Sequence, residues 1–261
     1  MDNNKRKIAV VNFKSSQDIM ANIANIERWL KKLVERQVDF VLFPELCITS
    51  YINSFSIHKV WDEHKAQAIM QLNKISQENP IMFSVGFPHN SYISQAIWNN
   101  GQMIGLHNKT KLGPSERGSF KCADELHITN IQGKFIGTSI CYESHFPEIS
   151  AKYEDQGAHL LCFPFASPRE TPEEKLKRFK MIIQARAYDN TCFACACNAV
   201  GEYGNGKQYA GAALIIGPHG DVIAETCGYE EDFIEAEIDL GEIDKIKSSS
   251  MGYFRAKENF R

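Results

Sequence analysis

The sequence predicts an α/β fold in a single domain that spans residues 1–261. Short apolar runs rich in β-branched and aromatic residues alternate with longer segments whose apolar residues recur at helical spacing, which is typical of α/β proteins. A chain of 261 residues is long enough to bury one sizeable core. No internal repeat, block of like charge or low-complexity linker divides it, so we expect one domain.

The first third of the chain predicts two strands and two helices. Residues 8–13 and 38–43 are apolar runs typical of buried strands. The helix between them is predicted by apolar residues at steps of three and four, namely Ile19, Ile23, Ile26, Leu30 and Leu33. A second helix is expected over residues 64–78, where Asn79-Pro80 ends it.

The rest of the chain continues the alternation. The expected strands are residues 81–87, 96–98, 103–107, 135–140, 160–165, 192–197, 212–216, 222–224 and 233–238. Asn99-Asn100-Gly101 favours the tight turn of a hairpin between the second and third of these strands. One helix is expected over residues 147–156, ended by Gly157, and another begins at Pro172 with Thr171 as its N-cap.

Composition and charge narrow the function classes. With 43% hydrophobic and 23% charged residues, the chain has the composition of a globular protein. The formal net charge of −3 lacks the basic excess of nucleic-acid-binding domains, so we expect no nucleic-acid partner. No segment resembles a signal peptide or reaches membrane-spanning length, so we expect a cytoplasmic protein with no membrane partner. The eight cysteines fit that compartment, where thiols stay reduced.

Three expected strands are each followed closely by one reactive side chain: Glu45, Lys109 and Cys141. In α/β folds the carboxyl ends of strands are where loops form binding sites, so we expect the three to meet. A thiolate nucleophile, a carboxylate that takes its proton and an ammonium that stabilises the oxyanion together form an acyl-transfer site without a metal. Taken singly, the three residues also fit a turn cap, a solvated charge and a buried filler, respectively.

Three further cysteines raise the alternative of a metal site. Zinc sites usually combine two paired clusters or partner histidines. Cys192, Cys195 and Cys197 instead lie in a run of small apolar residues, which favours packing inside a strand. We therefore expect no metal and no other cofactor. The glycine-rich residues 201–206 lack the spacing of a dinucleotide-binding motif and are expected to form a surface loop.

The segments around the three reactive residues resemble known motifs. FPELCITSY, HNKTKLG and TSICYESHFPEIS resemble, in this order, the Glu, Lys and Cys motifs of the nitrilase superfamily, the carbon–nitrogen hydrolases. The later segments GAHLLCFPFASP, QARAYDNTCFACACNAVG and AGAALIIGPHGDVIAE extend the resemblance. It covers nearly the whole chain, from Ile8 to about Leu240.

The resemblance implies a fold and a set of roles. The fold would be a four-layer α-β-β-α sandwich of two packed sheets with outer helices. Glu45 would be the general base, Lys109 the transition-state stabiliser and Cys141 the nucleophile that forms a thioester acyl-enzyme. The backbone N–H of Tyr142 would help to hold the oxyanion. Glu116 matches a second glutamate that amidase and carbamoylase members place near the nucleophile, although the charge of a surface loop is an equal alternative.

Two other charged residues are candidates for substrate binding. Lys111 stands where the family often has His, and we expect it at the mouth of the site while Lys109 is placed deeply. Arg169 closely follows the expected strand 160–165. One interpretation is that it binds a substrate carboxylate, and the other is that it is an ordinary charged residue before the next helix.

We therefore predict a hydrolase of non-peptide C–N bonds that acts on a small-molecule amide or N-carbamoyl substrate and releases ammonia or an amine. A nitrile hydrolase and an N-acyltransferase of the same superfamily are the alternatives among enzymes. An inactive binding or scaffold homologue is the alternative from another class. The resemblance also implies self-association, at least as a homodimer with two-fold symmetry.

Overall fold

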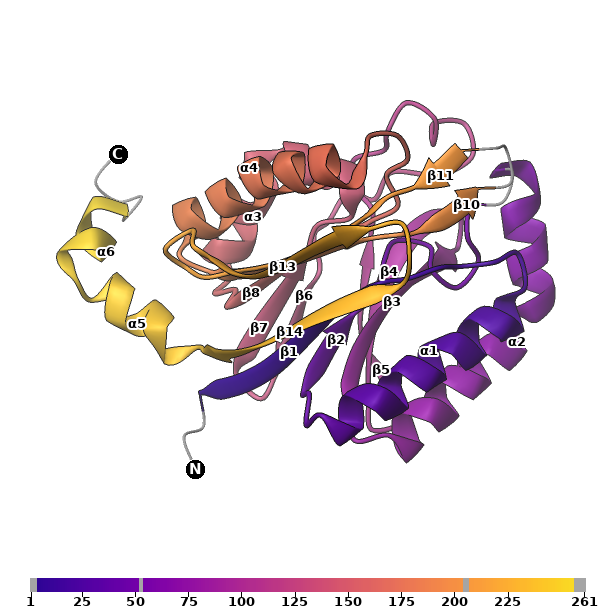
Figure 1. Ribbon diagram of the computed structural model, residues 1–261, viewed down its shortest axis with the longest axis horizontal. Helices are drawn as coiled ribbons and strands as arrows, with labels where there is room; N and C mark the ends of the chain where they lie inside the picture. The colour runs from indigo at the N-terminus through magenta and orange to yellow at the C-terminus, as the bar shows by residue number, and fades with distance from the viewer. Residues whose placement is uncertain (1–3, 52–53, 204–206, 256–261) are drawn as a thin grey trace.

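The computed structural model describes residues 4–51, 54–203 and 207–255. Its strands form two large sheets, with helices on the outer face of each (Figure 1). Gly204 and Gly206 of the expected glycine-rich loop lie outside the described residues.

The first sheet carries strands from the N-terminal half and the last strand of the chain. Its order is β14 (Asp232–Asp239), β1 (Lys5–Asn12), β2 (Phe40–Leu42), β3 (Met82–His89), β4 (Tyr92–Asn99) and β5 (Gln102–Asn108). The central strands β1, β2 and β3 are parallel, and the remaining pairs are antiparallel. Helices α1 (Ile19–Glu35) and α2 (Ser54–Glu78) pack on the outer face of this sheet.

The second sheet is built in the same way from the C-terminal half. Its order is β13 (Val222–Gly228), β12 (Gly211–Ile216), β9 (Phe193–Asn198), β8 (Leu160–Phe165), β7 (Lys134–Thr138) and β6 (Ile128–Ile131). Strands β7, β8 and β9 are parallel. Helices α3 (Pro147–Asp155) and α4 (Pro172–Asn190) cover its outer face, and the 3-10 helix η1 (Cys141–His145) precedes α3. The short pair β10 (Gly201–Tyr203) and β11 (Lys207–Tyr209) and the helices α5 (Gly241–Lys247) and α6 (Ser250–Arg255) complete the described elements.

The alternation of side chains along the strands produces the four layers. On β1, Ile8 and Val10 face the second sheet, whereas Ala9 and Val11 face the helices α1 and α2. Because successive residues of a strand point to opposite faces, each central strand contributes to two apolar cores. The α-β-β-α sandwich expected from the sequence is confirmed.

The same alternation separates Cys192, which directly precedes β9, from Cys195 and Cys197 within β9. Cys195 and Cys197 lie in the core between the sheets, and Cys192 lies in the core under α3 and α4. All three are buried, as predicted, and the Sγ atoms of Cys195 and Cys162 are 3.6 Å apart. Within the described ranges, no group of three or more Cys, His, Asp or Glu side chains has the arrangement of a metal site.

Several local predictions are confirmed by the backbone. Asn100 and Gly101 have positive φ values of 48° and 79°, as a tight hairpin turn of this type requires. The Thr171 side chain accepts a hydrogen bond from the N–H of Glu174, and the Glu174 carboxylate accepts one from the N–H of Thr171, which completes a capping box. None of the helices described is both long enough and apolar enough to cross a membrane.

Other boundaries were wrong. Helix α2 begins at Ser54, ten residues before the expected start, and Ile57 and Trp61 supply the buried side chains of its added turns. Strand β7 ends at Thr138 instead of residue 140, because the N–H of Ile140 donates to the Glu143 carboxylate at 2.6 Å. A side chain thus replaces the neighbouring strand as the partner of that amide. The elements β6, β10, β11, α5 and α6 were not expected.

Gly86 on β3 allows the turn after β2 to lie against the sheet. A Cβ atom at Gly86 would overlap the backbone nitrogen of Leu46 and come within 3.0 Å of the carbonyl carbon of Glu45. Gly86→Ala should therefore displace this turn and destabilise the protein by about 1–3 kcal/mol, as is typical of overpacking. Urea unfolding measures the loss. Gly228→Ala is the control, because nothing lies within 4 Å of its Cβ position, and an equal loss in both variants would contradict the steric argument.

Candidate active site

The loops after β2, β5 and β7 bring Glu45, Lys109 and Cys141 together. The Nζ of Lys109 donates to the Oε1 of Glu45 at 2.6 Å, and the side chain of Cys141 is hydrogen-bonded to the same carboxylate. Lys109 and Glu45 are buried, with exposed fractions of 0% and 2%. The three strand-end residues that the sequence singled out therefore meet in one cluster.

Glu45 is held by donors on two sides. Its Oε1 accepts from Lys109, and its Oε2 accepts from the backbone N–H of Ala166 at 3.1 Å. Burial raises the pKa of Glu45, the Lys109 charge lowers it and the Glu116 charge raises it again, so that it lies above the ordinary value. A carboxylate with a raised pKa is suited to take up and return a proton near neutral pH.

Lys109 bridges two carboxylates. Its Nζ lies 2.6 Å from Glu45 and 2.7 Å from the Oε1 of Glu116. Burial alone would lower the pKa of Lys109, but the neighbouring carboxylates, Glu45 first and then Glu116, outweigh burial and raise the pKa above its usual range. The ammonium is therefore charged at any working pH. Glu116 is itself buried and accepts from the Tyr51 hydroxyl at 2.6 Å and the N–H of Gly113 at 2.6 Å, so it is not a surface charge.

Cys141 begins η1 in a strained conformation. Its φ of 46° lies in the left-handed region, which a non-glycine residue adopts only where the surroundings enforce it. Burial and the Glu45 charge raise the pKa of the thiol well above its ordinary value, and Lys109 and the N–H of Ala166 offset this only in part. The resting group is consequently a thiol. A thiol at this place becomes a nucleophile when a neighbouring base removes its proton.

A third buried carboxylate supports the cluster. Glu143 accepts from the N–H of Ile140 at 2.6 Å, from the N–H and hydroxyl of Thr110 at 2.8 and 2.6 Å, and from the Nε2 of His107 at 3.0 Å. It thus ties the segment that carries Lys109 to the segment that carries Cys141. Burial would raise the pKa of Glu143, but His107 and Thr110 outweigh burial and lower it. The sequence reasoning missed this role, although a carboxylate two residues after the Cys was the available signal.

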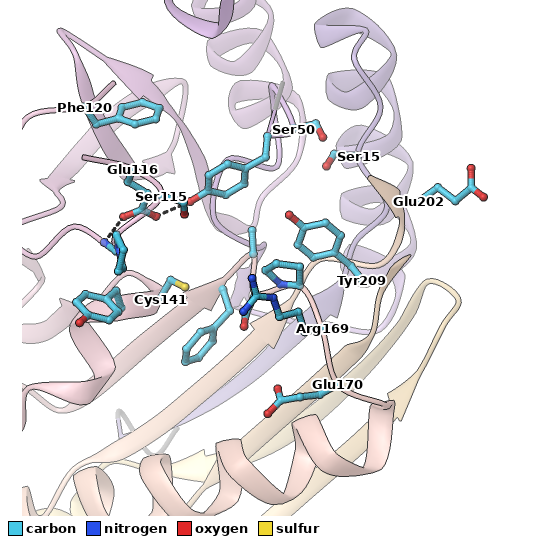
Figure 2. A pocket seen from close by; sticks show the side chains of 18 of the residues that line it. Ser15, Ser50, Ser115, Glu116, Phe120, Cys141, Arg169, Glu170, Glu202 and Tyr209 are labelled. Carbon is cyan, nitrogen blue, oxygen red and sulfur yellow. Dashed lines mark hydrogen bonds between the residues drawn. The ribbon is translucent and has the colours of Figure 1, made fainter. Parts of the chain in front are cut away.

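A cavity of about 1370 Å³ opens above the cluster. Glu116, Cys141 and Arg169 project into it from the loops after β5, β7 and β8 (Figure 2). Tyr142 lines it with them, and so does Tyr51, which the sequence reasoning also missed. Its other lining residues include Ser15, Ser50, Ser115, Phe120, Phe165, Glu170, Arg178, Glu202 and Tyr209.

The two neighbouring lysines occupy different environments. Lys109 is fully buried, whereas Lys111 is exposed and places its Nζ 5.7 Å from the centre of the Phe146 ring. The predicted difference in depth is confirmed. Lys111 does not line the cavity, and the structure does not bring it to the cluster of Glu45, Lys109 and Cys141.

Comparison with known proteins gives one consistent result. A family model described as Carbon-nitrogen hydrolase matches residues 7–248. The 2-oxoglutaramate amidase of Bacillus subtilis (strain 168) is 31% identical over 236 residues, which cover 87% of this chain and 88% of that protein. The N-carbamoylputrescine amidase of Arabidopsis thaliana is 28% identical over 280 residues, which cover 96% of this chain and 92% of that protein. A solved carbon-nitrogen hydrolase from Helicobacter pylori G27 has a TM-score of 0.85 at 18% identity, covering 98% of this chain and 96% of that one.

Replacing Glu143 should destabilise the protein strongly at neutral pH. Glu143→Ala leaves His107 and the buried donors of Ile140 and Thr110 without a partner, which costs about 3–5 kcal/mol. Because the folded-state pKa of Glu143 is lowered, its contribution is complete above the ordinary value of 4.5 and is lost as the pH falls through the folded-state pKa. Urea unfolding of wild type and variant across this range measures the difference.

The control for this prediction is Glu148→Ala, which removes an exposed carboxylate from the first turn of α3. It should change stability little. A difference between wild type and Glu143→Ala that grew as the pH fell would contradict the assignment of Glu143 as a charged acceptor.

Proposed function

The chain belongs to the carbon–nitrogen hydrolase family, and we propose that it hydrolyses the C–N bond of a small-molecule amide or N-carbamoyl compound through a covalent intermediate on Cys141. The observation that carries this proposal is the buried contact of Lys109 with Glu45 and Glu116 beside the Cys141 thiol, below an open cavity. Two relatives are named as amidases, which supports an amide or carbamoyl group as the substrate.

In the proposed first half-reaction, Glu45 takes the proton of the Cys141 thiol, and the thiolate attacks the carbonyl carbon. The negative charge moves to the carbonyl oxygen, where the Lys109 ammonium and the backbone N–H of Tyr142 stabilise it. When the tetrahedral intermediate collapses, the C–N bond breaks, and Glu45 returns its proton to the leaving nitrogen. Ammonia or an amine departs and a thioester remains on Cys141.

In the second half-reaction, Glu45 takes a proton from a water molecule that attacks the thioester. Lys109 and Tyr142 stabilise the second oxyanion in the same way, and collapse breaks the C–S bond. The proton on Glu45 returns to the Cys141 sulfur. The carboxylic acid departs, or carbamic acid in the case of a carbamoyl substrate, and the thiol is restored.

Three expectations from the sequence stay predictions. They are the homodimer, the cytoplasmic location and the role of Lys111 in substrate binding. Light scattering of the purified protein at micromolar concentration measures the first of them.

The test of the proposed function is ammonia release from a panel of simple amides, nitriles and N-carbamoyl amino acids. We expect wild type to release ammonia from amides or carbamoyl compounds, and Cys141→Ala to release none. Mass spectrometry of quenched wild type should find an acyl group on Cys141 alone. Cys122→Ser is the control, because Cys122 is exposed and does not line the cavity. Full activity in Cys141→Ala would refute the mechanism, and activity on nitriles alone would favour the nitrile hydrolase alternative.

The pH profile should depend on Glu116. Its negative charge raises the pKa of Glu45, so Glu116→Gln should lower that pKa. As the base, Glu45 must be ionised, and the acid limb of the kcat profile should therefore move to lower pH in Glu116→Gln. Glu202→Gln, which removes a carboxylate from the outer cavity, should leave the limb in place. A shift of the limb to higher pH in Glu116→Gln would contradict the role of Glu45.

A further inference from the structure

One wall of the cavity is formed by residues 167–170, directly after β8, and we call them the wall segment. Arg169 and Glu170 within it have φ values of 70° and 68°. Two consecutive non-glycine residues in the left-handed region persist only where the surrounding structure determines their conformation. The wall segment is therefore held by specific interactions.

A buried cation holds the wall segment from below. The side chain of Lys175 on α4 is 0% exposed, and its Nζ donates to the carbonyl oxygens of Ser167 at 2.8 Å and Pro168 at 3.2 Å. The same Nζ lies 3.1 Å from the carboxylate of Glu170, and the Nη2 of Arg178 lies 2.6 Å from it. Two cations on α4 therefore neutralise Glu170 and turn its carboxylate toward the helix.

Strand β9 fixes the other end of the wall segment. The Oδ1 of Asn198 accepts from the N–H of Ser167 at 2.8 Å, and its Nδ2 donates to the carbonyl oxygen of Ser167 at 3.0 Å. Because Glu170 is already engaged, Arg169 has no carboxylate within ion-pair distance in the part of the chain that the structure describes. Figure 2 shows its side chain reaching back toward the side of the cavity where Cys141 lies.

The carboxylates around the cavity do not neutralise the positive charge of Arg169. Glu116 is bound by Lys109 and Tyr51, and Glu170 is bound by α4. Glu202 is exposed and points away from Cys141 in Figure 2. Arg169 is itself exposed and lines the cavity, so the cavity presents an accessible guanidinium, whose planar donors match a carboxylate.

We propose that Lys175 and Arg178 hold Glu170 so that Arg169 presents its guanidinium to the cavity, and that Arg169 selects amides whose far end carries a carboxylate. This inference rests on the proposed function and names its substrate class. Lys175 is a positioning residue in this scheme, because it acts on the substrate only through Arg169.

Three amides of equal chain length test the selection. They are the monoamide of glutaric acid, pentanamide and the corresponding ω-amino amide, which differ in the charge of the far end. The kcat/KM of wild type should be about tenfold or more higher for the glutaric monoamide than for pentanamide, and lowest for the ω-amino amide. The selectivity ratio is kcat/KM for the glutaric monoamide divided by kcat/KM for pentanamide. Arg169→Ala should lower this ratio about ten- to hundredfold, and Arg169→Lys should lower it less. Glu202→Gln, the matched control, should not lower it.

A double-mutant cycle tests the positioning role. Lys175→Met should raise KM for the glutaric monoamide more than it changes kcat, and should lower the same ratio. In the Arg169→Ala background it should have no further effect on the ratio, because its influence passes through Arg169. A further reduction there would overturn the positioning role. If Lys175→Met does not fold, the two Arg169 variants decide the carboxylate selection.

Binding to the Cys141→Ala protein separates this inference from the reaction. Calorimetry should find that the glutaric monoamide binds more tightly than pentanamide, and that Arg169→Ala removes the difference. Such binding without ammonia release by wild type would support the carboxylate site and refute the proposed reaction. Ammonia release at equal kcat/KM from the three amides, or a ratio unchanged in Arg169→Ala, would overturn the inference and leave the proposed reaction standing.

Discussion

The site depends on one buried cation. Lys109 has no exposed surface, so its charge is stable only because Glu45 and Glu116 face its Nζ at 2.6 and 2.7 Å. Removing one partner of such a buried pair costs about 3–5 kcal/mol, and two carboxylates without the ammonium would repel each other. The position of Lys109 therefore determines where both carboxylates lie, and through Glu45 it determines the environment of the Cys141 thiol.

Charged side chains join the loops of the site, beside an apolar cluster that includes Leu46, Leu112 and Ile140. The loops after the strands bury backbone amides that no neighbouring strand can satisfy. Glu45 accepts from Ala166, and Glu143 accepts from Ile140 and Thr110. Each carboxylate thus accepts from the unpaired amide of another loop and fixes the position of that loop.

The fold links the cluster of Glu45, Lys109 and Cys141 to the cavity wall. Strand β8 is central in its sheet, and the loop that follows it contributes the N–H of Ala166 to Glu45 and the side chain of Arg169 to the cavity. Ala166 and Arg169 are only three positions apart in the chain. A displacement of the wall segment would therefore act on Glu45 as well as on Arg169, and Lys175 holds this segment through Ser167 and Glu170.

The sequence by itself determined the alternation of elements, the hairpin at Asn100-Gly101, the cap at Thr171 and the strand ends that carry Glu45, Lys109 and Cys141. These follow from local chemistry, namely apolar periodicity, turn preference and capping, which a single segment carries within itself. The motif resemblance added the roles, which stay proposals.

Only the tertiary structure decided which charges are buried and which partners they have. The sequence left Glu116 open between a place near the nucleophile and a surface loop, and it placed Lys111 at the mouth of the site. In the structure Glu116 contacts Lys109, and Lys111 is exposed and does not line the cavity. Glu143 and Lys175 bind segments 33 and 8 residues away, and the sequence does not specify these partners. The physical reason is that the pKa and the energy of a charged group depend on its burial and on partners that are distant in the chain, and neither is a property of the local sequence.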